Sequence, residues 1–124
     1  MKRLTPVIIV ETIEPALPFW VDKLGFKKGA EVPHEGHLGF IILERDDVQV
    51  MYQSKASVAA DVPALAGTPQ KGNALFIEVD NLDAVVKSLG DIKPVVPRRK
   101  TFYGADEYIV REPGGNVVTF AQFS

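Results

Sequence analysis

The sequence of 124 residues repeats one pattern twice: a strand, a helix and three further strands. In the first copy, the β-branched run 7–10 is followed by apolar residues spaced for one helical face. Strand-like segments then follow near 26–33, 38–44 and 47–53. A four-stranded sheet with one helix leaves its second face uncovered, so neither copy buries its apolar surface alone. This duplication limits the possible folds more than any other feature.

The second copy has the same order of elements. A strand is predicted at 75–79, and a helical stripe that ends at Gly90 follows it. Further strands are predicted near 93–97, 106–112 and 116–123. Each element of the first copy therefore has a counterpart.

The two copies align at an almost constant spacing, since Val10 matches Val79 and Gln53 matches Gln122. We therefore predict an α+β fold, in which two βαβββ modules pair into a half-barrel around a groove. The alternative, a ferredoxin-like βαββαβ arrangement, does not account for three strands between residues 26 and 53. The predicted organisation is one domain over 1–124, with module 1 at about 4–53, a connection at 54–72 and module 2 at about 73–123.

Composition argues against several classes of function. The 14 Lys and Arg against 16 Asp and Glu give a formal charge of −2, so we expect neither nucleic acid nor a membrane surface as partner. The basic run 98–100 is interpreted as a solvated loop, with anion recruitment as the alternative. The absence of cysteine excludes thiolate chemistry. No stretch approaches the roughly 18 apolar residues of a membrane span, and the start of the chain lacks a cleavage pattern. We expect a cytoplasmic protein.

Motifs in both copies resemble a known family, the vicinal oxygen chelate superfamily, which includes glyoxalase I, extradiol dioxygenases and bleomycin resistance proteins. The resemblance covers about residues 4–123. Glu112 is a mild departure, because the superfamily usually has aspartate there. The segments that carry the resemblance are Phe19-Trp20, Leu24-Gly25-Phe26, Phe102-Tyr103-Gly104 and Glu112-Pro113-Gly114-Gly115-Asn116.

The resemblance implies a divalent metal in the groove, held by His, Gln or Glu at four strand positions. Counted along the motifs, these positions are Thr5, Val50, Ala74 and Thr119. Alanine and valine have no donor atoms, and threonine hydroxyls are poor ligands for transition metals. We therefore predict no metal and no cofactor. Whether the chain is an enzyme stays open, with the balance against it.

Strand alternation predicts which residues line the groove. The lining would be mostly apolar with tyrosines, which suits a flat aromatic or apolar organic ligand. The resemblance to the bleomycin resistance branch implies a homodimer that sequesters an antibiotic without catalysis. The predicted ligand-binding residues are Val7, Val50, Tyr52, Phe76, Phe102, Tyr103, Tyr108, Val110 and Thr119.

Two further hypotheses stay open. One is a metal-dependent lyase or dioxygenase of the same superfamily with displaced ligands, drawn from His34 or His37 with Glu78. The other is a structural or regulatory module whose groove is filled by its own side chains.

Overall fold

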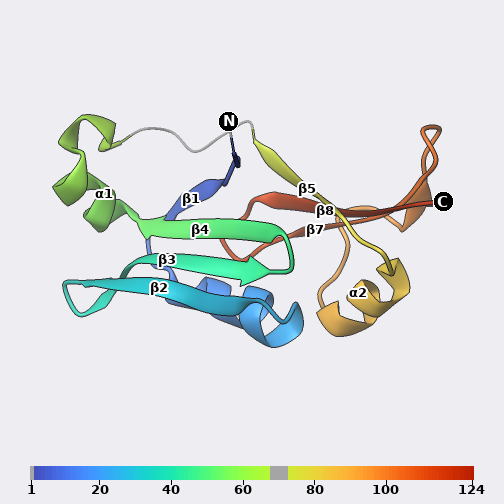
Figure 1. Cartoon of the computed structure of the whole chain (residues 1–124), viewed down its shortest axis with the longest axis horizontal. Helices are drawn as coiled ribbons and strands as arrows, with labels where there is room; N and C mark the ends of the chain where they lie inside the picture. The colour runs from blue at the N-terminus through green and yellow to red at the C-terminus, as the bar shows by residue number, and fades with distance from the viewer. Residues whose placement is uncertain (1, 68–72) are drawn as a thin grey trace. The chain divides into compact units, whose positions relative to one another are not determined.

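Each half of the chain folds around its own four-stranded mixed sheet (Figure 1). The computed structural model describes residues 2–67 and 73–124. The chain divides into two compact units, unit 1 (residues 1–71) and unit 2 (residues 72–124). The fold is α+β, as predicted from the duplicated pattern.

Unit 1 contains β1 (Val7–Val10), β2 (Lys27–His34), β3 (His37–Arg45) and β4 (Val48–Ser54). The strand order is β1-β4-β3-β2. β1 runs parallel to β4, and the other neighbours are antiparallel. The three strands predicted between 26 and 53 are therefore present.

The segment between β1 and β2 differs from the single helix that the apolar spacing predicts. It forms a 3-10 turn, η1 (Glu14–Ala16), and a π-helix, η2 (Pro18–Lys23). Pro18 has no N–H to continue the hydrogen bonding of η1, so the segment starts again there. Trp20 of η2 is fully buried and makes an edge-on ring contact with Phe26 at 4.9 Å. These elements cover one face of the unit 1 sheet, the helix face; we call its other face the open face.

The connection after β4 begins with a helix, α1 (Lys55–Asp61), and a 3-10 turn, η3 (Pro63–Leu65). Ser54 caps α1, because its side-chain oxygen accepts a hydrogen bond from the N–H of Ser57 at 3.1 Å. The rest of the predicted connection, residues 68–72, lies outside the described residues.

Unit 2 contains β5 (Ala74–Glu78), α2 (Leu82–Leu89), β6 (Arg99–Lys100), β7 (Ala105–Arg111) and β8 (Val117–Phe123). The order β5-β8-β7-β6 matches that of unit 1, again with one parallel and two antiparallel pairings. α2 covers one face of this sheet, its helix face (Figure 1).

The strand predicted at 93–97 is wrong. The edge strand is the two-residue β6 further along the chain. Pro94 and Pro97 lack the N–H that a strand needs for pairing. Val95, between them, still donates one backbone hydrogen bond to the carbonyl of Ile109.

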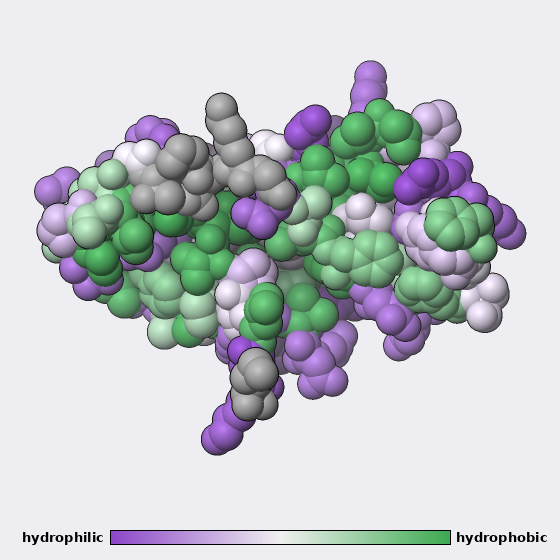
Figure 2. All heavy atoms as spheres, turned by 90° about the horizontal axis from the view of Figure 1, so that it is seen from above, coloured by the Kyte–Doolittle hydropathy of each residue, from purple (hydrophilic) through white to green (hydrophobic). Residues whose placement is uncertain are grey.

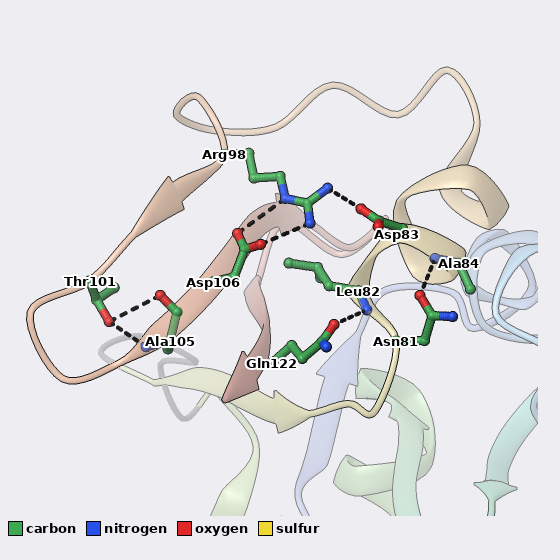
Figure 3. Close-up of polar contacts among 9 residues, drawn as sticks. All are labelled: Asn81, Leu82, Asp83, Ala84, Arg98, Thr101, Ala105, Asp106 and Gln122. Atoms are coloured by element: carbon green, nitrogen blue, oxygen red, sulfur yellow. Dashed lines mark hydrogen bonds and ion pairs between the residues drawn. The ribbon is translucent and has the colours of Figure 1, made fainter. Parts of the chain in front are cut away.

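Side-chain contacts attach α2 to the strands beneath it (Figure 3). The Asn81 side chain caps the helix by accepting a hydrogen bond from Ala84 N–H at 3.1 Å. Arg98 links Asp106 on β7 to Asp83 on α2, with N–O distances of 2.9 and 2.7 Å. Gln122 of β8 accepts a hydrogen bond from the N–H of the first helical residue at 2.7 Å. The helix face of β7 and β8 is therefore the face with Asp106 and Gln122.

Glu112 has a structural role in the turn between β7 and β8. Its buried carboxylate accepts hydrogen bonds from the N–H groups of Gly114 and Asn116 and from the Asn116 side chain. The glutamate that departs from the superfamily motif therefore satisfies the backbone of the motif's own turn.

Candidate functional site

The open face of unit 1 is defined by the pairing of β1 with β4. Val7 pairs with Met51, and the Thr5 hydroxyl donates a hydrogen bond of 2.7 Å to the side-chain oxygen of Gln49. Val50 and Tyr52 alternate with Met51 and are buried on the helix face, where Tyr52 receives a hydrogen bond from Trp20. The prediction that Val50 and Tyr52 share a face with Val7 is wrong.

The open face of unit 2 contains Phe76 and Thr119, which were expected to share a face and which pair with each other in the structure. Thr119 also pairs with Ile109 of β7, so Ile109 lies on this face. Tyr108 and Val110 lie on the helix face, since they pair with the buried Phe120 and Val118. Their predicted place beside Phe76 is therefore wrong.

The error at Val50 and Tyr52 comes from a change of one residue in the spacing of the repeat, whereas the error at Tyr108 and Val110 comes from the register of β7 against β8. Val7 and Phe76 are 69 residues apart, but their partners Met51 and Thr119 are 68 apart. Side chains alternate along a strand, so a shift of one residue moves each side chain to the other face. The match of Gln53 with Gln122 fails for the same reason.

Aromatic rings gather on the open face of unit 2 and at its margin. The Phe76 and Phe123 ring centroids are 6.3 Å apart, those of Phe123 and Tyr103 are 6.4 Å apart, and those of Tyr103 and Phe102 are 5.1 Å apart. Phe76 is 54 % exposed and Phe102 is fully exposed. We call these four residues the aromatic cluster. Figure 2, seen from the side of the unit 2 sheet opposite α2, shows hydrophobic atoms mixed with polar ones there.

A row of cross-strand neighbours underlies the cluster. Ala121 of β8 pairs with Glu78 of β5 on one side and with Glu107 of β7 on the other. Glu107 pairs in turn with Arg99 of β6. Ala121 is buried and carries only a methyl group, so the row has a small residue between two glutamates.

Glu107 is the best-satisfied acid of this row. Its side chain is 1 % exposed, and its Oε1 accepts hydrogen bonds from Nε and Nη2 of Arg99 at 3.1 and 3.0 Å. Its Oε2 accepts a hydrogen bond from the Tyr103 hydroxyl. This hydrogen bond raises the pKa of Tyr103, because the neighbouring carboxylate disfavours a phenolate. The hydroxyl of Tyr103 is therefore anchored to β7 through Glu107, while its ring contacts Phe123 and Phe102.

The sequence prediction found only part of this cluster. It included Phe76, Phe102 and Tyr103 and omitted Phe123, and it also omitted Glu107, which holds Tyr103. Both omitted residues alternate in step with Thr119, which had been placed on the correct face. Continuing that alternation to the end of β8 and across to β7 was the available signal.

The positions that the resemblance implies for metal ligands do not fit a transition metal. In unit 1 the open face offers the hydroxyl of Thr5 and the amide of Gln49, in place of the buried Val50. In unit 2, Ala74 pairs with Val117, and neither side chain has a donor atom. Transition metals favour imidazole, carboxylate and thiolate ligands. Within residues 2–67 and 73–124, no three His, Asp or Glu side chains form a metal-binding group.

The two histidines lie beside carboxylates at the β2–β3 hairpin. His34 Nε2 is 3.8 Å from Glu35, and His37 Nδ1 is 3.9 Å from Glu14. Glu14 also accepts a hydrogen bond from Leu38 N–H at 2.8 Å, which lowers the pKa of Glu14. Glu78 belongs to unit 2 and the two histidines belong to unit 1, so neither unit by itself contains the displaced ligand set of a histidine with Glu78.

An open hollow in unit 1 has a volume of about 590 Å³. Lysine, arginine and acidic side chains line it together, including Lys27, Lys28, Glu44 and Arg45. None of the predicted ligand-binding residues contributes to it. No helix in the described parts of the chain is long and apolar enough to cross a membrane.

Comparison with known proteins agrees with the motifs. The chain belongs to the Glyoxalase/Bleomycin resistance protein/Dioxygenase superfamily, whose sequence profile matches residues 3–120. A comparison with the sequences of curated proteins gave no match.

Solved structures with the same fold cover almost the whole chain. A glyoxalase/bleomycin resistance protein/dioxygenase from Nocardioides has a TM-score of 0.76 at 15 % identity, over 99 % of this chain and 84 % of its own. TioX from Micromonospora sp. ML1 has a TM-score of 0.75 at 16 % identity, over 100 % of both chains. A family enzyme from Burkholderia phytofirmans PsJN has a TM-score of 0.76 at 14 % identity, over 97 % of both. At these identities the likeness extends to the fold alone.

Proposed function

We propose that this protein binds a flat aromatic or apolar organic compound without a metal and without transforming it, as in antibiotic sequestration. The observation that carries the proposal is the aromatic cluster on unit 2. The ring of Phe123 contacts the rings of Phe76 and Tyr103, and all three side chains still expose much of their surface. Exposed apolar groups gain free energy when an apolar partner covers them.

The cluster is suited to stacking. Ring pairs contribute about 0.5–1.5 kcal/mol beyond the area that they bury. Tyr103 is held by Glu107, and Phe76 lies on a strand that is paired with β8. These side chains therefore lose little conformational entropy when a ligand binds. A planar ligand that covers two or three rings would therefore bind with useful affinity.

The donor chemistry of the open faces supports binding over metal-assisted catalysis. The implied ligand positions hold Thr5, Val50, Ala74 and Thr119, which are two hydroxyls and two side chains without donor atoms. Gln49, which hydrogen-bonds to Thr5, adds one amide, so the set is poor for polarising a carbonyl through a metal. The superfamily name covers enzymes and resistance proteins alike, so it does not choose between them. We propose the same cytoplasmic location that the sequence led us to expect.

Isothermal titration with acridine, a neutral planar tricycle, tests the proposal. We expect the wild-type protein to bind acridine and the Phe76→Ala variant to bind it about three- to tenfold more weakly, for one lost ring contact. Val32→Ala removes an exposed apolar side chain from β2 of unit 1 and is the matched control, with unchanged affinity expected. Failure of the wild-type protein to bind acridine, or equal affinities in both variants, would contradict the proposal.

We also propose that the protein is a homodimer. Large apolar side chains outside the aromatic cluster remain exposed, including Leu4 and Val7 in unit 1. Such surfaces are commonly covered by a second copy. Sedimentation equilibrium should give twice the chain mass of 13.6 kDa. A single species at the chain mass across micromolar concentrations would refute the dimer.

A further inference from the structure

The row beneath the aromatic cluster carries an unbalanced negative charge. Glu78 and Glu107 flank Ala121 on the same face, with their Cα atoms two strand spacings, or about 10 Å, apart. Arg99 neutralises Glu107, and both of its hydrogen-bonding nitrogens contact one carboxylate oxygen. Two negative charges and one positive charge leave a net charge of −1 in this row.

Glu78 accounts for that remaining charge. Its side chain is exposed at the end of β5, and it makes no hydrogen bond or ion pair with any described residue. The next basic side chain of this face, Arg111, belongs to the row of Ala74 and Val117, two rows away. Arg111 also donates a hydrogen bond to the carbonyl of Gly115.

The two phenylalanine rings lie on either side of Glu78 along the sheet. Phe76 precedes Glu78 by two residues on β5, and Phe123 follows Ala121, the partner of Glu78, by two residues on β8. Their centroids are only 6.3 Å apart, so the rings lean toward each other across the row that contains Glu78. A ligand stacked on these rings would therefore lie beside a carboxylate.

From this placement we infer that the ligand of the aromatic cluster is a planar organic cation, whose charge is recognised by Glu78 and by the faces of Phe76 and Phe123. The inference rests on the proposed function and narrows its ligand class. The face of an aromatic ring attracts a cation, and the exposed carboxylate of Glu78 adds a direct Coulomb attraction. An anionic ligand of the same shape would meet repulsion from Glu78.

Three probes with one tricyclic core separate shape from charge. These are 9-aminoacridine, which is cationic at pH 7, neutral acridine, and anionic acridine-9-carboxylate, each titrated into the full chain. We expect 9-aminoacridine to bind about tenfold more tightly than acridine, a difference of about 1.4 kcal/mol. We expect acridine-9-carboxylate to bind most weakly.

Two variants assign the preference to Glu78. Glu78→Gln should abolish most of the preference for 9-aminoacridine over acridine, as measured by the ratio of the two dissociation constants in the same variant. Glu31→Gln makes the same change in net charge at an exposed site on β2 and should keep the preference. If no probe binds, the proposed function itself fails. If all three bind equally, or Glu78→Gln keeps the preference, or Glu31→Gln removes it equally, the inference alone is overturned.

Discussion

The indole Nε1–H of Trp20 donates a hydrogen bond of 2.8 Å to the hydroxyl oxygen of Tyr52, and both side chains are fully buried. The bond joins η2 to β4. It places Tyr52 on the helix face and thereby places Gln49 and Met51 on the open face of unit 1. One buried contact therefore decides which side chains of β4 are available to a ligand.

Removing the acceptor should destabilise unit 1. In the Tyr52→Phe variant the buried Trp20 N–H loses this partner, which should lower the free energy of unfolding by about 1–3 kcal/mol. Urea denaturation followed by tryptophan fluorescence measures the change. Tyr108→Phe is the control, because no hydrogen bond joins the Tyr108 hydroxyl to a described residue, and equal losses in both variants would argue against the bond.

The link between Arg98 and Asp106 should make stability depend on pH. The hydrogen bonds and charge of Arg98 lower the pKa of Asp106 in the folded protein. The stabilisation is therefore present above the unfolded pKa of about 3.9 and is lost as the pH falls through the lower folded value. Asp106→Asn should thus be less stable than wild type near neutral pH, with the difference shrinking below about pH 4.

Thermal unfolding of this variant from pH 7 to pH 3 checks the dependence. Asp61→Asn, at the exposed end of α1, removes the same charge without an ion pair in the described structure. A difference between Asp106→Asn and wild type that stays constant down to pH 3 would show that the link is not electrostatic.

The N-cap of α2 should contribute to the stability of unit 2. Asn81→Ala leaves the Ala84 N–H without its side-chain acceptor and should lower the free energy of unfolding by about 1 kcal/mol. Guanidinium denaturation followed by circular dichroism measures it. Asn73→Ala, exposed just before β5, should be neutral, so a neutral Asn81→Ala would mean that the cap adds nothing.

The sequence was sufficient for the fold class, because the order of the elements along the chain and their duplication follow from local apolar patterns. β2, β3 and β4 lie within a residue or two of their predicted ranges. β6 was misplaced because an edge strand of two residues, just after Pro97, has little pattern of its own.

The candidate site was harder to predict, because it depends on register. Phe76 and Thr119 were placed correctly. Tyr52 was not, since one residue separates the repeat spacings of the first and last strands, and Val110 was not, since β7 pairs with β8 one residue out of the expected register. No local signal marks such a change. It follows from which large side chain packs under the helix, as Tyr52 does under Trp20.

In the proposed function the protein binds a planar compound through aromatic contacts and needs no metal. The most direct test is acridine titration of protein dialysed against a chelator, compared with the same protein after addition of Zn²⁺, Ni²⁺ or Fe²⁺. The account predicts the same dissociation constant in every sample and no stoichiometric metal by elemental analysis. Binding that appears only with one of these metals retained at one equivalent per chain would contradict it.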